Sequence, residues 1–141
     1  MTLRKQKIKK LKWKDFFDAV ETIATYVEAS SLKFINIYGI PRGGLMLAVM
    51  LSHRLKIPFI TRGKITKYTL IVDDICDQGD TVKRLVKSMN DYKNFKVIVW
   101  IRNNDVIPFL MPVFWVGEKS NNEWVQFPWE TPETSKYDYT T

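Results

Sequence analysis

Short runs of apolar residues alternate along this chain with longer segments in which apolar residues recur at helical spacing. The run at 68–72 has the length and β-branched content of a strand buried on both faces. Similar runs predict further strands at 33–38, 58–61, 95–101, 113–116 and 124–127. Helical spacing predicts three amphipathic or buried helices over Trp13–Val27, Leu45–Leu55 and Val82–Met89.

Strands and helices that follow each other in this order predict an α/β fold. We expect a central, mostly parallel five-stranded sheet flanked by helices and built with right-handed crossovers. The length of 141 residues fits one domain. We assign residues 1–130 to that domain and 131–141 to a polar C-terminal tail.

The most informative stretch joins the strand at 68–72 to the next predicted helix. Asp73 and Asp74 follow the strand, and a short polar turn, Asp77–Thr81, leads into the helix. In open α/β sheets, ligands bind at this edge, and the backbone N–H groups of such a turn favour a phosphate, with Gly79 allowing close approach. The alternative is an acidic turn in which Asp80 or Thr81 acts only as a helix cap.

These residues resemble the diphosphate-sugar signature of the type I phosphoribosyltransferases. That pattern is an apolar strand, two acids, two apolar residues and Asp-(Thr/Ser)-Gly-x-Thr, and Gln78 replaces its small hydroxyl residue. The resemblance implies that residues 77–81 bind the 5-phosphate of phosphoribosyl diphosphate (PRPP). It implies that Asp73 and Asp74 bind the ribose, that Mg²⁺ binds near Asp74, and that Asp77 accepts a proton from a purine. The individual phosphate-site residues are Asp77, Gln78, Gly79, Asp80 and Thr81.

A second strand-to-helix turn, Ile40–Gly44, is predicted at the same edge of the sheet. It is similar to the pyrophosphate loop of the purine branch of the family, in which an arginine and two glycines follow the first core strand. The resemblance assigns Arg42 and Gly43 to pyrophosphate, which the forked guanidinium suits. Taken alone, the segment could also be a plain glycine-rich connection.

The segment Glu123–Glu130 is similar to the Trp-(Ile/Val)-x-x-Pro-Trp-(Asp/Glu) ending of the xanthine-guanine and hypoxanthine phosphoribosyltransferases. It implies that Trp124 stacks on a purine, that Val125 offers backbone contacts, and that 103–130 form a small C-terminal hood. The alternative is that Trp124 and Trp129 are core aromatics under a short hairpin. Relatives contact the exocyclic oxygen of a 6-oxopurine with a lysine just after the strand matching 95–101. This chain has Arg102 there, which can donate to the same oxygen, so we expect Arg102 to contact the purine.

A second departure concerns the lid over the active site. Relatives carry a long mobile loop between the strands that match 58–61 and 68–72, and it keeps water from the reacting sugar. Only residues 62–67 remain here. Arg62 or Lys64 from this connection would then cover the pyrophosphate, or another subunit would supply the lid, or catalysis would be slow.

Composition and charge add context. Hydrophobic residues make up 45% of the chain, and the single cysteine, Cys76, excludes an internal disulfide and favours a reducing cytoplasmic location. We predict no signal peptide and no membrane partner. The net charge is +7, with cations concentrated in the basic N-terminal segment 1–12. That segment is read as a solvated tail and helix face, or as a site that attracts nucleic acid or a polyphosphate.

Together these features favour an enzyme of purine salvage. It would convert PRPP and guanine, xanthine or hypoxanthine to a nucleotide with Mg²⁺, as a homodimer or homotetramer. The alternative is a catalytically weak sensor of PRPP or nucleotides that binds RNA on the same fold. A pyrimidine or orotate enzyme sharing only the central loop is a third reading, which the 124–130 segment disfavours.

Overall fold

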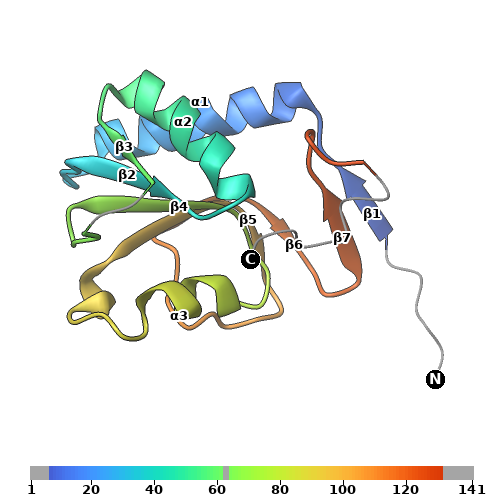
Figure 1. Ribbon diagram of the computed structural model, residues 1–141. Helices are drawn as coiled ribbons and strands as arrows, with labels where there is room; N and C mark the ends of the chain where they lie inside the picture. Colours follow the sequence, from blue (N-terminus) through green and yellow to red (C-terminus); the bar gives the residue numbers. More distant parts are fainter. Residues whose placement is uncertain (1–6, 62–63, 132–141) are drawn as a thin grey trace.

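A computed structural model describes residues 7–61 and 64–131. Its centre is a five-stranded sheet in which every neighbouring pair is parallel, in the order β3-β2-β4-β5-β6 (Figure 1). The strands are β2 (Asn36–Gly39), β3 (Phe59–Ile60), β4 (Thr69–Cys76), β5 (Lys96–Asn103) and β6 (Phe114–Lys119). The predicted α/β class and the five-stranded parallel sheet are confirmed.

The helices cover both faces of this sheet. Helices α1 (Trp13–Ala29) and α2 (Gly43–Leu55) lie on one face, and α3 (Asp80–Val86) lies on the other (Figure 1). A short 3-10 helix, η1 (Tyr92–Asn94), leads into β5. Helix α1 begins where the Asp15 carboxylate accepts the backbone N–H of Lys12 at 2.8 Å, which satisfies one of the N–H groups left open at a helix start.

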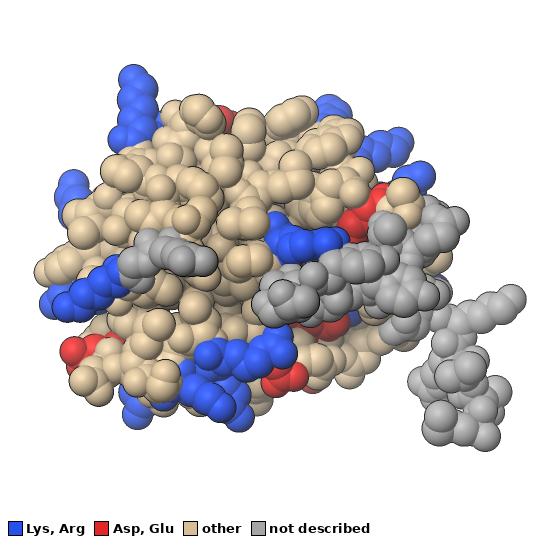
Figure 2. Space-filling view, viewed as in Figure 1, with Lys and Arg blue, Asp and Glu red and all other residues tan. Residues whose placement is uncertain are grey.

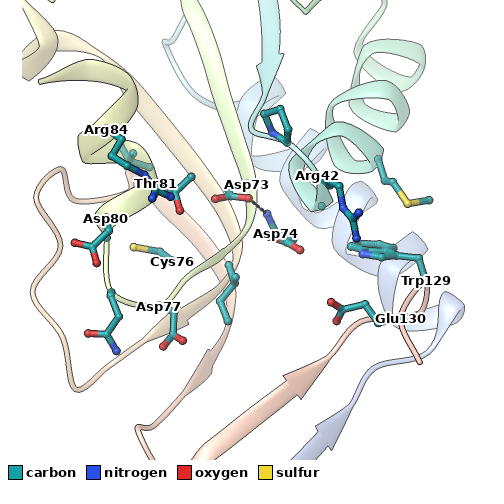
Figure 3. Close-up of a pocket in the computed structure, with 17 residues that line it drawn as sticks. Arg42, Asp73, Asp74, Cys76, Asp77, Asp80, Thr81, Arg84, Trp129 and Glu130 are labelled. Carbon is teal, nitrogen blue, oxygen red and sulfur yellow. Dashed lines mark hydrogen bonds between the residues drawn. The ribbon is translucent and has the colours of Figure 1, made fainter. Parts of the chain in front are cut away.

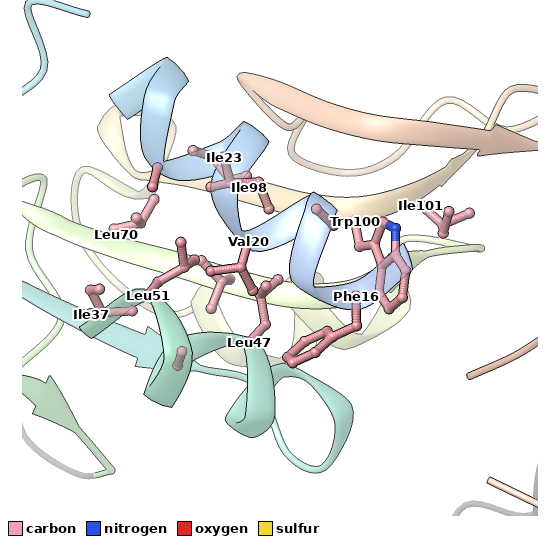
Figure 4. Close-up of a cluster of buried hydrophobic side chains, with 14 of the residues drawn as sticks. Phe16, Val20, Ile23, Ile37, Leu47, Leu51, Leu70, Ile98, Trp100 and Ile101 are labelled. Carbon is pink, nitrogen blue, oxygen red and sulfur yellow. The ribbon is translucent and has the colours of Figure 1, made fainter. Parts of the chain in front are cut away.

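Two apolar clusters, one on each side of the sheet, explain the continuous apolar runs within the central strands. Leu70 and Val72 of β4 pack with α1 and α2, whereas Ile71 between them packs with Val82 and Val86 of α3. Side chains alternate between the faces of a strand, so the part of a strand that is covered on both faces, such as residues 70–72, is apolar at successive positions. Figure 4 shows the larger cluster, in which Phe16, Val20 and Ile23 of α1 meet Leu47 and Leu51 of α2 over the sheet.

A separate two-stranded sheet forms from the two ends of the described chain. Strand β1 (Lys7–Lys10) pairs in parallel with β7 (Glu123–Gln126), and Ile8 lies opposite Trp124 (Figure 1). Residues 7–10 are not a free tail, because their backbone pairs with β7, although their side chains stay largely exposed to solvent as expected. Strands β6 and β7 belong to different sheets, so residues 113–127 do not form a paired hairpin.

Strand β4 is longer at its carboxyl end than the predicted 68–72 run. It continues through Asp73 and Asp74 to Cys76, because residues 73, 75 and 76 still pair with β5. Both acids therefore lie on a rigid strand rather than in a turn. None of the helices in the described ranges is long and apolar enough to cross a membrane.

Candidate functional site

A cavity of about 510 Å³ opens where the carboxyl ends of β2 and β4 meet the starts of α2 and α3 (Figure 3). Its wall contains Pro41–Gly43 from the β2–α2 turn, Asp73–Thr81 from the end of β4 and the following loop, and Trp129 and Glu130 from the C-terminal segment. The two turns that the sequence singled out therefore share one cavity.

The β4–α3 loop presents open hydrogen-bond donors to this cavity. Within the described part of the chain, no acceptor lies on the backbone N–H groups of Gln78, Gly79, Asp80 and Thr81. Gly79 has φ +80°, and a Cβ there would lie 3.0 Å from Pro108, so a side chain at residue 79 would be strained. A loop of free N–H groups in a conformation that needs glycine is suited to an anion.

Arg84 adds a cation that sequence reasoning did not identify. It lies one turn into α3 and lines the cavity, and Figure 3 shows its side chain beside Thr81. Lys83 precedes it on the same helix, and Figure 2 shows Lys and Arg side chains gathered over α3. The spacing of three residues from Thr81 could have indicated this position, because residues i and i+3 share a helix face.

Asp73 and Asp74 point in different directions within the cavity. Asp73 is 6% exposed, and its Oδ1 accepts the backbone N–H of Asp74 at 2.8 Å. Burial raises the pKa of Asp73 well above its usual range, and the neighbouring Asp74 carboxylate raises it further. Burial also raises the pKa of Asp74. In Figure 3 the Asp73 carboxylate extends towards Thr81, whereas Asp74 extends towards Arg42 and Glu130.

Gly43 lets α2 approach Asp74 closely. A Cβ at residue 43 would overlap the Asp74 carboxylate, so any larger residue at this position would force that carboxylate to move. Arg42, which precedes it, lines the cavity opposite the β4–α3 loop, and the Pro41–Arg42 peptide bond is cis. Arg42 and Gly43 are thus brought together with the paired acids, as the sequence predicted. Arg62 lies outside the described residues.

Glu130 is a second carboxylate on the wall shared with Asp74. Its Oε1 accepts the backbone N–H of Phe127 at 2.9 Å. Burial raises the pKa of Glu130, the nearby Asp74 carboxylate raises it further, and Arg42 acts in the opposite direction. A bound cation would favour the charged forms of both groups.

These carboxylates fit a magnesium ion that takes most of its ligands from elsewhere. Asp74 and Glu130 offer oxygen atoms, which Mg²⁺ prefers. Two carboxylates are a common protein share of a Mg²⁺ site in which substrate phosphates and water supply the other ligands. Cys76 also lines the cavity, but burial raises the pKa of its thiol to about 11, so it is no ready nucleophile.

A smaller pocket of about 140 Å³ adjoins the main cavity. Trp124, Val125 and Phe127 form its apolar part, and Lys119 is its cation. Asp74, Asp77 and Glu130 line both spaces, so the two are continuous in their walls. A flat aromatic ligand with polar edges matches one tryptophan face plus a few polar groups.

Asp77 lies between the two spaces and makes two polar contacts. Its Oδ1 accepts from Lys119 Nζ at 3.0 Å and from Asn103 Nδ2 at 2.9 Å, whereas no hydrogen bond within the described ranges reaches Oδ2. Asn103 and Lys119 lie opposite each other on β5 and β6. The sequence did not indicate either residue, because their meeting depends on how these strands pair.

Neither Arg102 nor Trp129 lines the small pocket. The guanidinium of Arg102 lies 4.8 Å from the ring centre of Trp115, and Arg102 lines neither space. Its location gives no support to the expected purine contact. Trp129 stacks on Phe127 with ring centres 5.4 Å apart and meets Phe16 edge-on at 5.5 Å. Trp129 thus packs against the core and also lines the main cavity, whereas Trp124 lines the small pocket.

The fold of this chain is similar to the folds of several solved protein structures. No protein-family model matches the sequence, and no curated protein matches it either. Among solved structures, a purine phosphoribosyltransferase from Pyrococcus horikoshii Ot3 is 27% identical with a TM-score of 0.73, over 88% of this chain and 94% of that one.

Two further structures are similar at lower identity. The Helicobacter pylori xanthine-guanine-hypoxanthine phosphoribosyltransferase is 17% identical with a TM-score of 0.71, over 87% of this chain and 93% of that one. A hypothetical protein from Neisseria gonorrhoeae with bound ppGpp is 18% identical with a TM-score of 0.72, over 91% and 92%. The chain therefore has the type I phosphoribosyltransferase fold and resembles the purine phosphoribosyltransferases.

Proposed function

We propose that this protein is a purine phosphoribosyltransferase that transfers the phosphoribosyl group of PRPP to a 6-oxopurine. The observation that carries the proposal is that the main cavity and the small pocket lie side by side. A cavity with open N–H donors and paired acids adjoins a small aromatic pocket, and Asp74, Asp77 and Glu130 line both. A sugar phosphate in the first and a base in the second would meet beside these carboxylates.

The sugar substrate binds through three sets of groups in this proposal. Backbone N–H groups of residues 77–81 hold the 5-phosphate, and Arg84 supplies a positive charge beside them. Asp73 and Asp74 accept hydrogen bonds from the ribose hydroxyls. Arg42 faces the diphosphate from the β2–α2 turn, where Gly43 permits close approach.

The chemistry is a displacement at the anomeric carbon. Trp124 holds the base while a ring nitrogen bonds to that carbon, and the carbon–oxygen bond to pyrophosphate breaks with its electron pair leaving on pyrophosphate. The second carboxylate oxygen of Asp77, a residue that lines both spaces, accepts the proton that the base nitrogen gives up. Bound Mg²⁺, held by Asp74 and Glu130, would offset negative charge on the leaving group.

Nucleotide formation is the direct test. The purified protein should convert PRPP with guanine, xanthine or hypoxanthine into the monophosphate and pyrophosphate, in a reaction that needs Mg²⁺. PRPP with Mg²⁺ should also raise the melting temperature, since ligands that bind only the folded state stabilise it. No product with any of the three bases, together with no thermal shift by PRPP, would refute the enzyme.

A nucleotide sensor that binds RNA is the second candidate. Two observations favour it: the connection between β3 and β4 is short, and a structure of the same fold contains bound ppGpp. A sensor should bind PRPP or guanine nucleotides without turnover, and it should bind RNA in a salt-dependent way that these ligands modulate. Two results would count against a sensor: RNA binding that no nucleotide alters, or the absence of RNA binding at low salt.

A further inference from the structure

Another cavity lies at the opposite edge of the sheet from the proposed active site. Its volume is about 660 Å³, within the range of roughly 300 to 1,000 Å³ that is usual for small-molecule sites. One wall is the segment 64–68, just before β4, and the other consists of residues between α3 and β5. We call this cavity the distal groove.

The distal groove is separate from the main cavity. Strand β4 begins at the groove and ends at the main cavity (Figure 1), and its eight residues span about 23 Å. The two spaces have no lining residue in common. A ligand in one therefore leaves the other open.

Hydrogen bonds fix both walls of the groove without a ligand. The backbone N–H of Thr66 donates to Thr69 Oγ1 at 3.1 Å, and the backbone N–H of Thr69 donates to Thr66 O at 3.0 Å. Tyr68 N–H donates to Thr66 Oγ1 at 3.1 Å. On the other wall, Asn94 N–H donates to Asp91 O at 2.8 Å. The groove is thus formed in advance, as small-molecule sites usually are.

The inner surface of the groove is apolar. Ile65 and Phe95 are buried members of the apolar cluster under α3, and Met89 packs against that cluster. The exposed ring of Tyr68 continues this surface towards solvent. A flat aromatic ring laid against these side chains would remove apolar surface from water on both partners.

The rim of the groove is polar and carries more positive than negative charge. Lys64 and Lys67 face one acid, Asp91, among the lining residues. The Lys67 ammonium lies 5.2 Å from the ring centre of Tyr68, so a cation stands beside the aromatic surface. Lys64, which the sequence offered as a cover for pyrophosphate, lines this groove and not the main cavity.

Two side-chain amides on the rim are available for a ligand. Asn90 and Asn94 both line the groove, and their amides make no hydrogen bond within residues 7–61 and 64–131. An amide offers both donors and an acceptor, which suits the mixed polar edge of a nucleobase. Two lysines on the same rim suit a phosphate chain.

We propose that the distal groove is a second ligand site, which binds a nucleoside phosphate. The base lies against Ile65, Met89 and Phe95, and the phosphates meet Lys64 and Lys67. Inorganic phosphate would leave the apolar surface uncovered, and an uncharged nucleoside would leave the two ammonium groups without an anion. The proposal uses no residue of the proposed reaction, so each can be correct without the other.

The test maps ATP binding by NMR, because amide resonances report on each site separately. At about 0.15 M salt, which screens distant charges, ATP should shift the amides of residues 64–69 and 89–95. Adenosine and tripolyphosphate carry the two parts of ATP separately. Each should bind at the groove at least about tenfold more weakly than ATP.

A double variant, Lys64→Ala with Lys67→Ala, tests the rim. It should weaken ATP binding at the groove by about tenfold or more, since it removes both cations. Lys7→Ala with Lys10→Ala is the matched control, because it removes the same charge from exposed positions on β1. The control should change this affinity by less than about twofold.

Three results would overturn the proposal. One is ATP shifts confined to residues 77–81, which would mean that the nucleotide binds only in the main cavity. Another is tripolyphosphate binding at the groove as tightly as ATP, which would indicate attraction to surface charge alone. The third is an equal loss of affinity in the two double variants. Shifts at residues 77–81 with PRPP and Mg²⁺ would leave the proposed function intact in each case.

Discussion

Asp77 gives the sharpest prediction for a single residue. Asp77→Asn keeps the size of the side chain, and the amide oxygen can still accept from Asn103 and Lys119. What it loses is the ability to take up a proton at the second oxygen. We expect turnover to fall by about 100-fold or more while the dissociation constant of PRPP changes little. Steady-state kinetics and calorimetry with PRPP measure the two effects, and unchanged turnover would remove Asp77 from proton transfer.

The two tryptophans of the C-terminal motif should respond to substitution in opposite ways. Trp124 lines the small pocket, so Trp124→Ala should raise the Michaelis constant of the purine by about tenfold, the typical effect of losing one stacking contact. Trp129 packs on Phe16 and Phe127, so Trp129→Ala should lower the free energy of unfolding by about 2 to 4 kcal/mol. Enzyme kinetics and chemical denaturation should be measured for both variants, so that each variant is the control for the other. If Trp129→Ala raised the Michaelis constant and Trp124→Ala lowered the stability, the roles of the two tryptophans would be exchanged.

Some residues of the site could be identified from the sequence, and others could not. Asp73, Asp74 and Gly79 could be identified because a strand, two acids and a glycine follow one another along the chain. Lys119 and Asn103 could not, because they lie on different strands and meet only through the parallel pairing of β5 and β6. Arg102 was expected in the pocket from its place in the sequence. Neighbouring strand residues point to opposite faces, however, and its side chain lies against Trp115 instead.

Among the elements, β4 and β5 were the easiest to predict and β1 was missed. The part of a strand that is covered on both faces is apolar at successive positions, and that pattern stands out in the sequence. Strand β1 consists of three lysines and one isoleucine, and its side chains stay largely exposed. Its order comes from backbone pairing with β7, which leaves no hydrophobic pattern to detect.

The β1–β7 pairing predicts a role for the N-terminal segment in base binding. Ile8 lies opposite Trp124 and Lys9 opposite Val125, and the backbone N–H of Leu11 donates to Gln126 O at 2.9 Å. Deleting residues 1–10 removes the strand that borders β7, so we expect purine affinity to fall by about fivefold or more with PRPP affinity nearly unchanged. Deleting residues 1–6, which keeps β1, is the matched control. Equal purine affinity in the two truncated proteins would show that β1 does not support the pocket.

On the scale of the whole molecule, the site is a concentration of negative charge in a chain that is positive overall. The net charge is +7, yet Asp73, Asp74, Asp77, Asp80 and Glu130 all border one cavity. The surrounding positive charge favours the approach of a polyphosphate, whereas the carboxylates at the cavity suit a phosphate that arrives with Mg²⁺. We therefore expect the site to work on a magnesium complex rather than on a bare anion.

This arrangement makes global stability depend on pH in a defined direction. The pKa of Asp73 is raised in the folded protein, mainly by burial, so the folded state holds this proton more tightly than the unfolded state. Below the unfolded value, near pH 4, both states are protonated and the residue has no net effect on folding. As the pH rises above that value, the unfolded state loses the proton first, and the buried carboxyl increasingly destabilises the ligand-free fold.

Asp73→Asn removes this titration and leaves an amide of similar size. At pH 8 the ligand-free variant should melt about 3 °C or more above wild type, and the difference should shrink towards zero near pH 4. The same variant should be stabilised less than wild type by PRPP with Mg²⁺, because a group that binds ribose has been altered. Melting curves from pH 4 to 8, with and without PRPP and Mg²⁺, measure both effects. A variant that is less stable than wild type at pH 8 would contradict this prediction, because it would mean that the Asp73 carboxylate stabilises the ligand-free fold.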